Sequence, residues 1–155
     1  TVWAFATASH DSPMLFHAIA EVAKALSNDF DSLSLANTVW AFATASQASA
    51  ALFDAVAEMA KACLKDLNSQ ELANTVWALA TAEHASPVLF DAVAEMARVY
   101  LKDFTSQSLA NTVWAFATAG HAAPILFDSI ADVAIVRLKD FTSQNLANTV
   151  WAFAT

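Results

Sequence analysis

Four asparagines, spaced 37 residues apart, are the side chains in this sequence best suited to bind another molecule. They are Asn37, Asn74, Asn111 and Asn148. An amide side chain both donates and accepts hydrogen bonds, so it can contact the edge of a nucleic-acid base or the main chain of a peptide. The same amide could instead bond the backbone of a neighbouring segment, because buried polar groups need partners. The sequence leaves both roles open.

Two sets of threonines and one variable position accompany the asparagines. If the asparagines face a ligand, we expect the threonines to share that face, and we expect the variable position to select between ligands. The first threonine set is Thr38, Thr75, Thr112 and Thr149, the second is Thr44, Thr81, Thr118 and Thr155, and the variable position holds Ser34, Glu71, Ser108 and Asn145.

Histidines and carboxylates also recur, but their spacing favours neither metal binding nor catalysis. His10, His84 and His121 share one position of the repeat. Equivalent atoms of adjacent packed helices lie roughly 10 Å apart, whereas zinc needs its ligands at roughly 2 Å. Carboxylates four residues apart, such as Asp91 and Glu95, share a solvated helix face and lack the burial that a catalytic acid needs. We therefore expect no enzyme activity, no cofactor and no metal site.

The asparagines belong to a repeat of constant length. Trp3, Trp40, Trp77, Trp114 and Trp151 follow one another at steps of 37 residues, without insertion or deletion. A fixed period of this size indicates a stacked array. Glycine occurs once and proline three times, and such a low content of turn residues favours helices. We predict an all-α fold, an α-solenoid of stacked 37-residue helical hairpins that forms a right-handed αα superhelix like those of tetratricopeptide and pentatricopeptide repeats.

Residues 67–103 show how one unit would fold. Ser69 can cap a first helix over residues 69–82, and Pro87 suits the first turn of a second helix over residues 87–101. The first helix is apolar on most sides, so it needs neighbours, whereas the second carries one charged stripe. We expect the charged stripe on the convex side of the array and the asparagines on the concave side. For the tryptophans, packing between repeats is favoured over stacking on bases.

The period divides the chain into one continuous array. It comprises a partial repeat at 1–29, full repeats at 30–66, 67–103 and 104–140, and a partial repeat at 141–155. The last seven residues match the first seven letter for letter. We therefore expect a fragment of a longer array.

Charge and hydropathy limit the class of partner. The formal net charge of −8 fits no simple polyanion-binding surface, and the helices that contain the asparagines carry no Lys or Arg. The acidity suits a basic partner. No run of about 18 apolar residues occurs, so we expect no membrane insertion.

One stretch of the repeat matches a known pattern. It reads Phe104-Thr-Ser-Gln107-x-Leu109-Ala110-Asn111-x-x-Trp114-Ala115-x-Ala117, followed by Gly120 and Pro124. This pattern resembles the octotricopeptide repeat, whose unit is one residue longer. The resemblance implies helical hairpins, single-stranded RNA as the ligand, and a role in organellar transcript stability, processing or translation. It also suggests a chloroplast or mitochondrion as the compartment.

The expected function is therefore that of a non-enzymatic binding module. The leading hypothesis is sequence-selective binding of single-stranded RNA. The alternative is a scaffold that binds a protein, either as an extended or basic peptide or within a larger assembly. Head-to-tail self-association is a third possibility, because an unfinished hairpin at each end could stack on another copy.

Overall fold

The computed structural model describes residues 64–155 without a gap and, before them, isolated positions only. Those positions are 14, 18, 22, 34, 37, 38, 40–42, 54, 57, 58, 60 and 61. All regular structure in this part of the chain is helical, and it contains no strand. The prediction of an all-α protein is confirmed.

One short 3₁₀ helix followed by two long helices is the recurring order through residues 64–155. The long helices start at residues 69, 87, 106, 124 and 143, so equivalent helices are 37 residues apart. The predicted helices at 69–82 and 87–101 match α5 and α6 to within one residue. In chain order the elements are η2 (Leu64–Asp66), α5 (Ser69–Thr81), α6 (Pro87–Tyr100), η3 (Leu101–Asp103), α7 (Ser106–Thr118), α8 (Pro124–Arg137), η4 (Leu138–Asp140) and α9 (Ser143–Ala154), where η marks a 3₁₀ helix.

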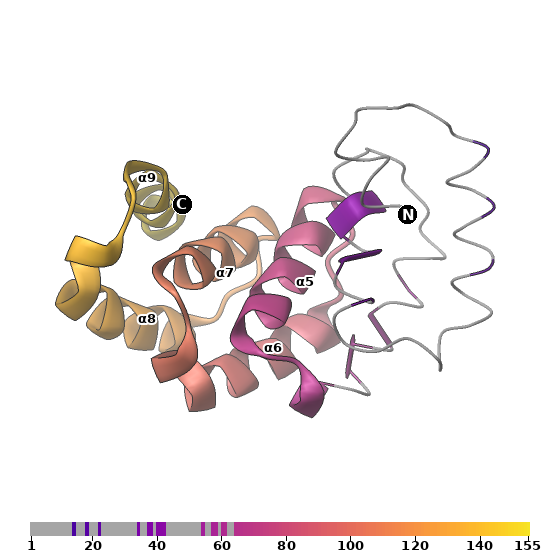
Figure 1. The fold of residues 1–155 in the computed structure, drawn as a ribbon, viewed down its shortest axis with the longest axis horizontal. Coiled ribbons are helices and arrows are strands. Elements are labelled where there is room, and N and C mark those ends of the chain that lie inside the picture. The colour runs from indigo at the N-terminus through magenta and orange to yellow at the C-terminus, as the bar shows by residue number, and fades with distance from the viewer. Residues whose placement is uncertain are drawn as a thin grey trace.

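The helices form two layers (Figure 1). The first layer contains α5, α7 and α9, and the second contains α6 and α8. Contacts between α5 and α7, and between α7 and α9, are much more extensive than the contact between α6 and α8. The first-layer helices therefore pack closely against one another, while the second-layer helices are held mainly by the first layer.

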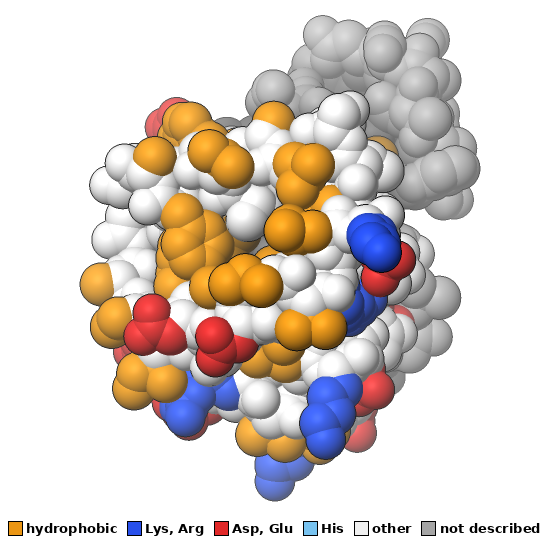
Figure 2. All heavy atoms as spheres, turned by 90° about the vertical axis from the view of Figure 1, so that its left-hand side faces the viewer, with side chains coloured by type: hydrophobic (Ala, Val, Ile, Leu, Met, Phe, Trp, Pro, Cys, Tyr) orange, Lys and Arg blue, Asp and Glu red, His pale blue; other side chains and the backbone are white. Residues whose placement is uncertain are grey.

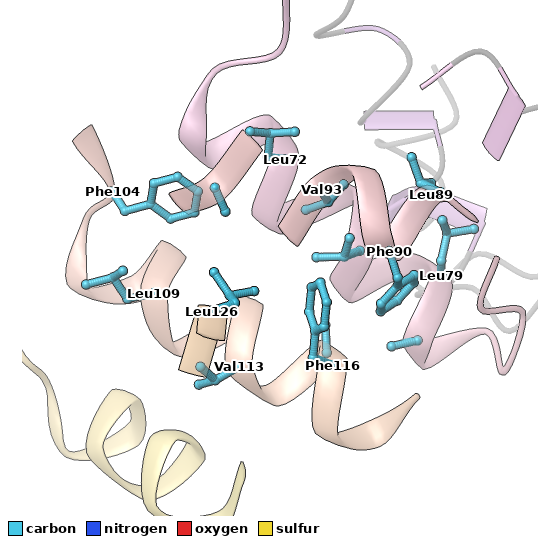
Figure 3. Packing of buried hydrophobic residues seen from close by; sticks show 14 of the residues in the cluster. Leu72, Leu79, Leu89, Phe90, Val93, Phe104, Leu109, Val113, Phe116 and Leu126 are labelled. Carbon is cyan, nitrogen blue, oxygen red and sulfur yellow. The ribbon is translucent and has the colours of Figure 1, made fainter. Parts of the chain in front are cut away.

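The core is shared between consecutive units of the repeat (Figure 3). Phe90 of α6 lies against Phe116 of α7, with ring centroids 4.9 Å apart. Leu79 of α5 and Leu126 of α8 belong to the same buried cluster. Because large aromatic side chains dominate buried contacts, the first helix of one unit completes the core of the unit before it.

Helix caps differ from the prediction by one residue. Asn68, not Ser69, caps α5: its Oδ1 accepts hydrogen bonds from the backbone N–H groups of Gln70 and Glu71, both at 3.0 Å. The Glu71 carboxylate in turn accepts the backbone N–H of Asn68 at 2.9 Å, which completes a capping box. In α7 the cap is Thr105.

The serines that follow the caps have a different role. The Ser69 hydroxyl donates to the backbone carbonyl of Asp103 at 2.9 Å, and the Ser106 hydroxyl donates to that of Asp140 at 2.8 Å. Each bond spans 34 residues and ties the start of one first-layer helix to the residues just before the next. The prediction of serine caps is wrong, because these hydroxyls donate to backbone carbonyls that precede the next first-layer helix.

The link after α5 and the link after α7 each contain one residue in the left-handed region. Gly120 has φ of 63° and its repeat equivalent Glu83 has φ of 54°. After α7, the N–H of His121 donates to the carbonyl of Phe116 and the N–H of Gly120 donates to that of Ala117, both at 3.0 Å. This pair of bonds is a Schellman motif, which reverses the chain toward the next helix.

Candidate functional site

One narrow side of α5 and one narrow side of α7 stay accessible to solvent. On α5 this side consists of Gln70, Asn74, Trp77 and Thr81, whose spacing of four, three and four residues places them on one helix face. The same four positions are partly or fully exposed on α7 and α9. We call this surface the Asn–Trp strip. Its members are Gln70, Asn74, Trp77, Thr81, Gln107, Asn111, Trp114, Thr118, Gln144, Asn148, Trp151 and Thr155.

The amides of the strip are not used by the fold. Asn74, Asn111 and Asn148 are half-buried, and among the described residues none of these three side chains forms a hydrogen bond with the protein. No buried side-chain nitrogen or oxygen in that part of the chain lacks a partner, so the amide atoms reach solvent. Asn37 is exposed as well. The amides are thus available to a ligand, and their part in binding stays a prediction.

The tryptophans form a continuous row along the strip. The ring centroids of Trp77 and Trp114 are 6.0 Å apart, and those of Trp114 and Trp151 are 6.3 Å apart. These distances lie within the range of favourable aromatic pairs. Packing between repeats is therefore confirmed for these three residues. Each ring also keeps part of its surface accessible.

Thr75 and Thr112 do not lie on the accessible face. Both are fully buried, and their hydroxyls donate to the carbonyls of Glu71 and Ser108, each at 2.8 Å. A residue directly after an asparagine is turned by about 100° around the helix, toward the neighbouring helix. Neither residue therefore lies on the accessible face where the prediction placed it. Thr38 makes the same bond to the carbonyl of Ser34, although it is only half-buried.

The variable position is part of the helix caps rather than of the accessible face. Glu71, Ser108 and Asn145 are all buried. The Ser108 hydroxyl lies 3.0 Å from the Thr105 hydroxyl, and the N–H of Asn145 donates to the Thr142 hydroxyl at 3.2 Å. These three positions therefore lie at the buried start of each helix and not on the accessible face where the prediction placed them. Their equivalent, Ser34, is exposed.

The second threonine set fits the strip where it is described. Thr81 and Thr118 are exposed, and the Thr81 hydroxyl donates to the carbonyl of Trp77 at 2.8 Å. Thr44 lies outside the described residues. The glutamines of the strip, Gln70 and its equivalents, were not predicted, although their four-residue distance from each asparagine could have identified them.

The strip carries no formal charge. Its side chains are amides, indoles and hydroxyls only. The lysines that recur in every described unit, Lys65, Lys102 and Lys139, lie exposed on η2, η3 and η4, and an aspartate follows each of them. A ligand would therefore be recognised through hydrogen bonds and stacking more than through ion pairs.

Neither a metal centre nor a membrane span is found among the described residues. They contain no group of three His, Cys, Asp or Glu side chains that could hold a metal ion. None of their helices combines the length and the apolar character needed to cross a bilayer. Compared with known proteins, the chain matches no protein-family model, and no curated protein matches it.

Proposed function

We propose that the chain is a non-enzymatic binding module that holds an extended single strand of RNA along the Asn–Trp strip. One observation carries the proposal: Asn74, Asn111 and Asn148 place half-buried amides, which have no partner in the described part of the chain, beside a continuous row of tryptophans. A packed helix fixes the position of these amides without forming hydrogen bonds to them, so they are preorganised for a ligand.

The proposed architecture is a right-handed α-solenoid whose units are residues 67–103 and 104–140. Equivalent helices recur every 37 residues, and each first-layer helix contacts the next. Since the first-layer helices pack more closely than the second-layer helices, the array would curve toward the first layer and carry the strip on its concave side.

RNA is favoured by the chemistry of the strip and by the resemblance to octotricopeptide repeats. One amide per repeat could contact one base edge, and exposed indole surface could stack on bases. That resemblance also supports a role in an organelle, in transcript stability, processing or translation.

The composition of the strip also limits sequence selectivity. Gln, Asn, Trp and Thr are the same on α5, α7 and α9, while the variable position is buried in the caps. Successive described units would therefore read the same base. We propose a preference for a run of one base rather than for a mixed sequence.

The charge of the strip predicts how binding depends on salt. Affinity for phosphates comes from Lys and Arg and falls steeply as the salt concentration rises. Because the strip has no cation, most of the affinity would come from bases, and the salt dependence would be shallow.

The test is fluorescence anisotropy with labelled homopolymeric RNA of each base, measured across a salt series. We expect one homopolymer to bind best, with little loss at higher salt, and Asn111→Ala to weaken binding. Thr112→Val is the matched control, since it alters the adjacent buried residue. Absence of RNA binding even at low salt would overturn the proposal.

An extended peptide is the second candidate, and the charge pattern favours it. The strip is neutral and the whole chain has a formal net charge of −8, which suits a basic peptide. Amides would bond the peptide main chain, and the tryptophans would hold its side chains. In the same assay, binding of a labelled Lys/Arg-rich peptide that Asn111→Ala weakens, without RNA binding, would identify this function.

A further inference from the structure

Each unit of the Asn–Trp strip presents two amide side chains. Gln70 and Asn74 lie four residues apart on α5, and Gln107 and Asn111 have the same spacing on α7. Side chains at this spacing on a helix are neighbours, with their Cβ atoms roughly 5–6 Å apart. The two glutamines are exposed, and in the described part of the chain no protein group bonds any of these four amides. One ligand group can therefore bond both amides of a unit.

The tryptophan row sets the spacing of the bases that the strip can hold. The ring centroids of Trp77, Trp114 and Trp151 follow one another at 6.0 and 6.3 Å. Nucleotides in a stacked strand are only about 3.4 Å apart, so bases placed one per unit are unstacked from each other. An unstacked base offers its Watson–Crick and Hoogsteen edges together. Its face is then free to stack on the accessible indole surface.

Charged side chains contribute little to this surface. The helices α7 and α9 contain no acidic or basic residue, and the one carboxylate of α5, that of Glu71, is buried. On the face seen in Figure 2, hydrophobic and uncharged side chains cover the part that α9 occupies, and most charged side chains lie below it. Discrimination between bases therefore depends on the donors and acceptors along their edges.

Adenine is the base whose edges match two amides. An amide has one donor and one acceptor side by side, and it pairs bidentately with the N6 and N7 atoms of adenine. Adenine repeats this pattern on its Watson–Crick edge with N6 and N1, and its amino group has one hydrogen for each amide. On the Hoogsteen edge guanine offers two acceptors, cytosine only its amino group and uracil only an oxygen. These three bases match one amide in this way, but not two.

We propose that the strip selects adenine, so that its ligand is an oligoadenylate strand with one base per unit. This inference rests on the proposed RNA-binding function and names the base. In each unit the glutamine bonds one edge of the adenine and the asparagine bonds the other, while an indole stacks on its face. The glutamines of α5, α7 and α9 are thereby specificity-determining residues; they are Gln70, Gln107 and Gln144.

Fluorescence anisotropy with labelled oligonucleotides of equal length tests this selection. We expect oligo(A) to bind at least about tenfold more tightly than oligo(C), oligo(G) or oligo(U), because each lost bidentate contact weakens binding by about five- to 100-fold. Oligo(7-deazaadenosine) is the matched control ligand, since it has a C–H group in place of N7 and keeps N1, N6 and the stacking surface. It should bind at least about fivefold more weakly than oligo(A). This comparison needs no change in the protein.

Replacement of the glutamines tests their role in the same assay. Leu33 occupies the equivalent position of the preceding repeat, so the repeat itself contains a leucine there. A variant that combines Gln70→Leu, Gln107→Leu and Gln144→Leu should keep the thermal unfolding of the wild type, because these side chains are exposed and leucine is a good helix former. It should lose most of the preference for oligo(A) over oligo(U), while its affinity for oligo(U) changes little.

The outcomes separate the choice of base from RNA binding itself. Equal or tighter binding of another homopolymer, undiminished binding of the 7-deaza oligomer, or an unchanged preference in the glutamine variant would each overturn the selection of adenine and leave RNA binding intact. Failure of all four homopolymers to bind would instead overturn the proposed function.

Discussion

The Nε2 atom of His121 lies 2.9 Å from the Oδ1 atom of Asp91, thirty residues earlier in the chain. His84 makes the same contact with Asp54 at 2.8 Å. The His121 ring also packs against Phe90, with centroids 5.5 Å apart. The link after α5 and the link after α7 are therefore each bonded to the second-layer helix of the preceding unit.

A double-mutant cycle should detect the interaction between His121 and Asp91. The variants are His121→Ala, Asp91→Ala and the combination, compared by urea unfolding. Because the Asp91 side chain is 74% exposed, we expect a coupling free energy of only about 0.5 kcal/mol, and less at high salt. Strictly additive losses of stability would show that the contact contributes nothing. His121→Ala combined with Asp132→Ala is the additive control.

The two equivalent phenylalanines should differ in their effect on stability. Phe116 is fully buried between α6 and the link, so Phe116→Ala should lower the free energy of unfolding by about 3–5 kcal/mol. Phe153→Ala should cost much less, because Phe153 is 44% exposed. Urea denaturation of both variants measures the difference, and equal losses of stability would mean that Phe153 is covered in solution.

Asn111 and Thr112 are adjacent but should behave in opposite ways. Asn111→Ala should weaken ligand binding and change stability by less than about 0.5 kcal/mol, because its amide has no partner in the described structure. Thr112→Val keeps the shape of a buried side chain and should retain ligand binding. The measurement is ligand titration with parallel thermal unfolding. Loss of binding in Thr112→Val alone would place the ligand elsewhere.

The left-handed residues allow a pure test of backbone strain. A Cβ atom at Gly120 would meet no atom within 4 Å, so the cost of Gly120→Ala comes from its φ of 63°. We expect a loss of about 1 kcal/mol. Glu83→Gly removes the same strain at the equivalent position and should stabilise the protein. Thermal unfolding of the two variants measures both changes in stability. No loss of stability in Gly120→Ala would mean that the turn relaxes to remove the strain.

The sequence period predicted the helices well and the accessible face only in part. Asn74 and Thr75 were assigned to one face, yet the first reaches solvent and the second is buried. A helical projection shows which residues share a side but not how many sides a neighbour covers. Because α7 has first-layer neighbours on both flanks, only the narrow strip around Asn111 remains accessible.

The caps were mispredicted because two adjacent residues were both capable of capping. Ser69 and Asn68 have suitable side chains, and the choice follows from the bond between Ser69 and Asp103. That partner lies 34 residues away, so local sequence rules do not include it.

The histidine contacts had a signal that the prediction overlooked. The described pairs join a link histidine to an aspartate thirty residues earlier. Where Gln47 replaces the link histidine, the position thirty residues before it is also changed, from Asp to His17. Two positions that change together are a mark of contact, and one chain with internal repeats is enough to show it.

Three kinds of contact between helices each join residues no more than 37 positions apart. His121 to Asp91 spans thirty residues, Ser106 to Asp140 spans 34, and Trp77 to Trp114 spans 37. A pulling force on the two termini would therefore detach one hairpin after another instead of rupturing the whole molecule at once. The protein would extend in near-equal steps under tension, in the manner of a molecular spring.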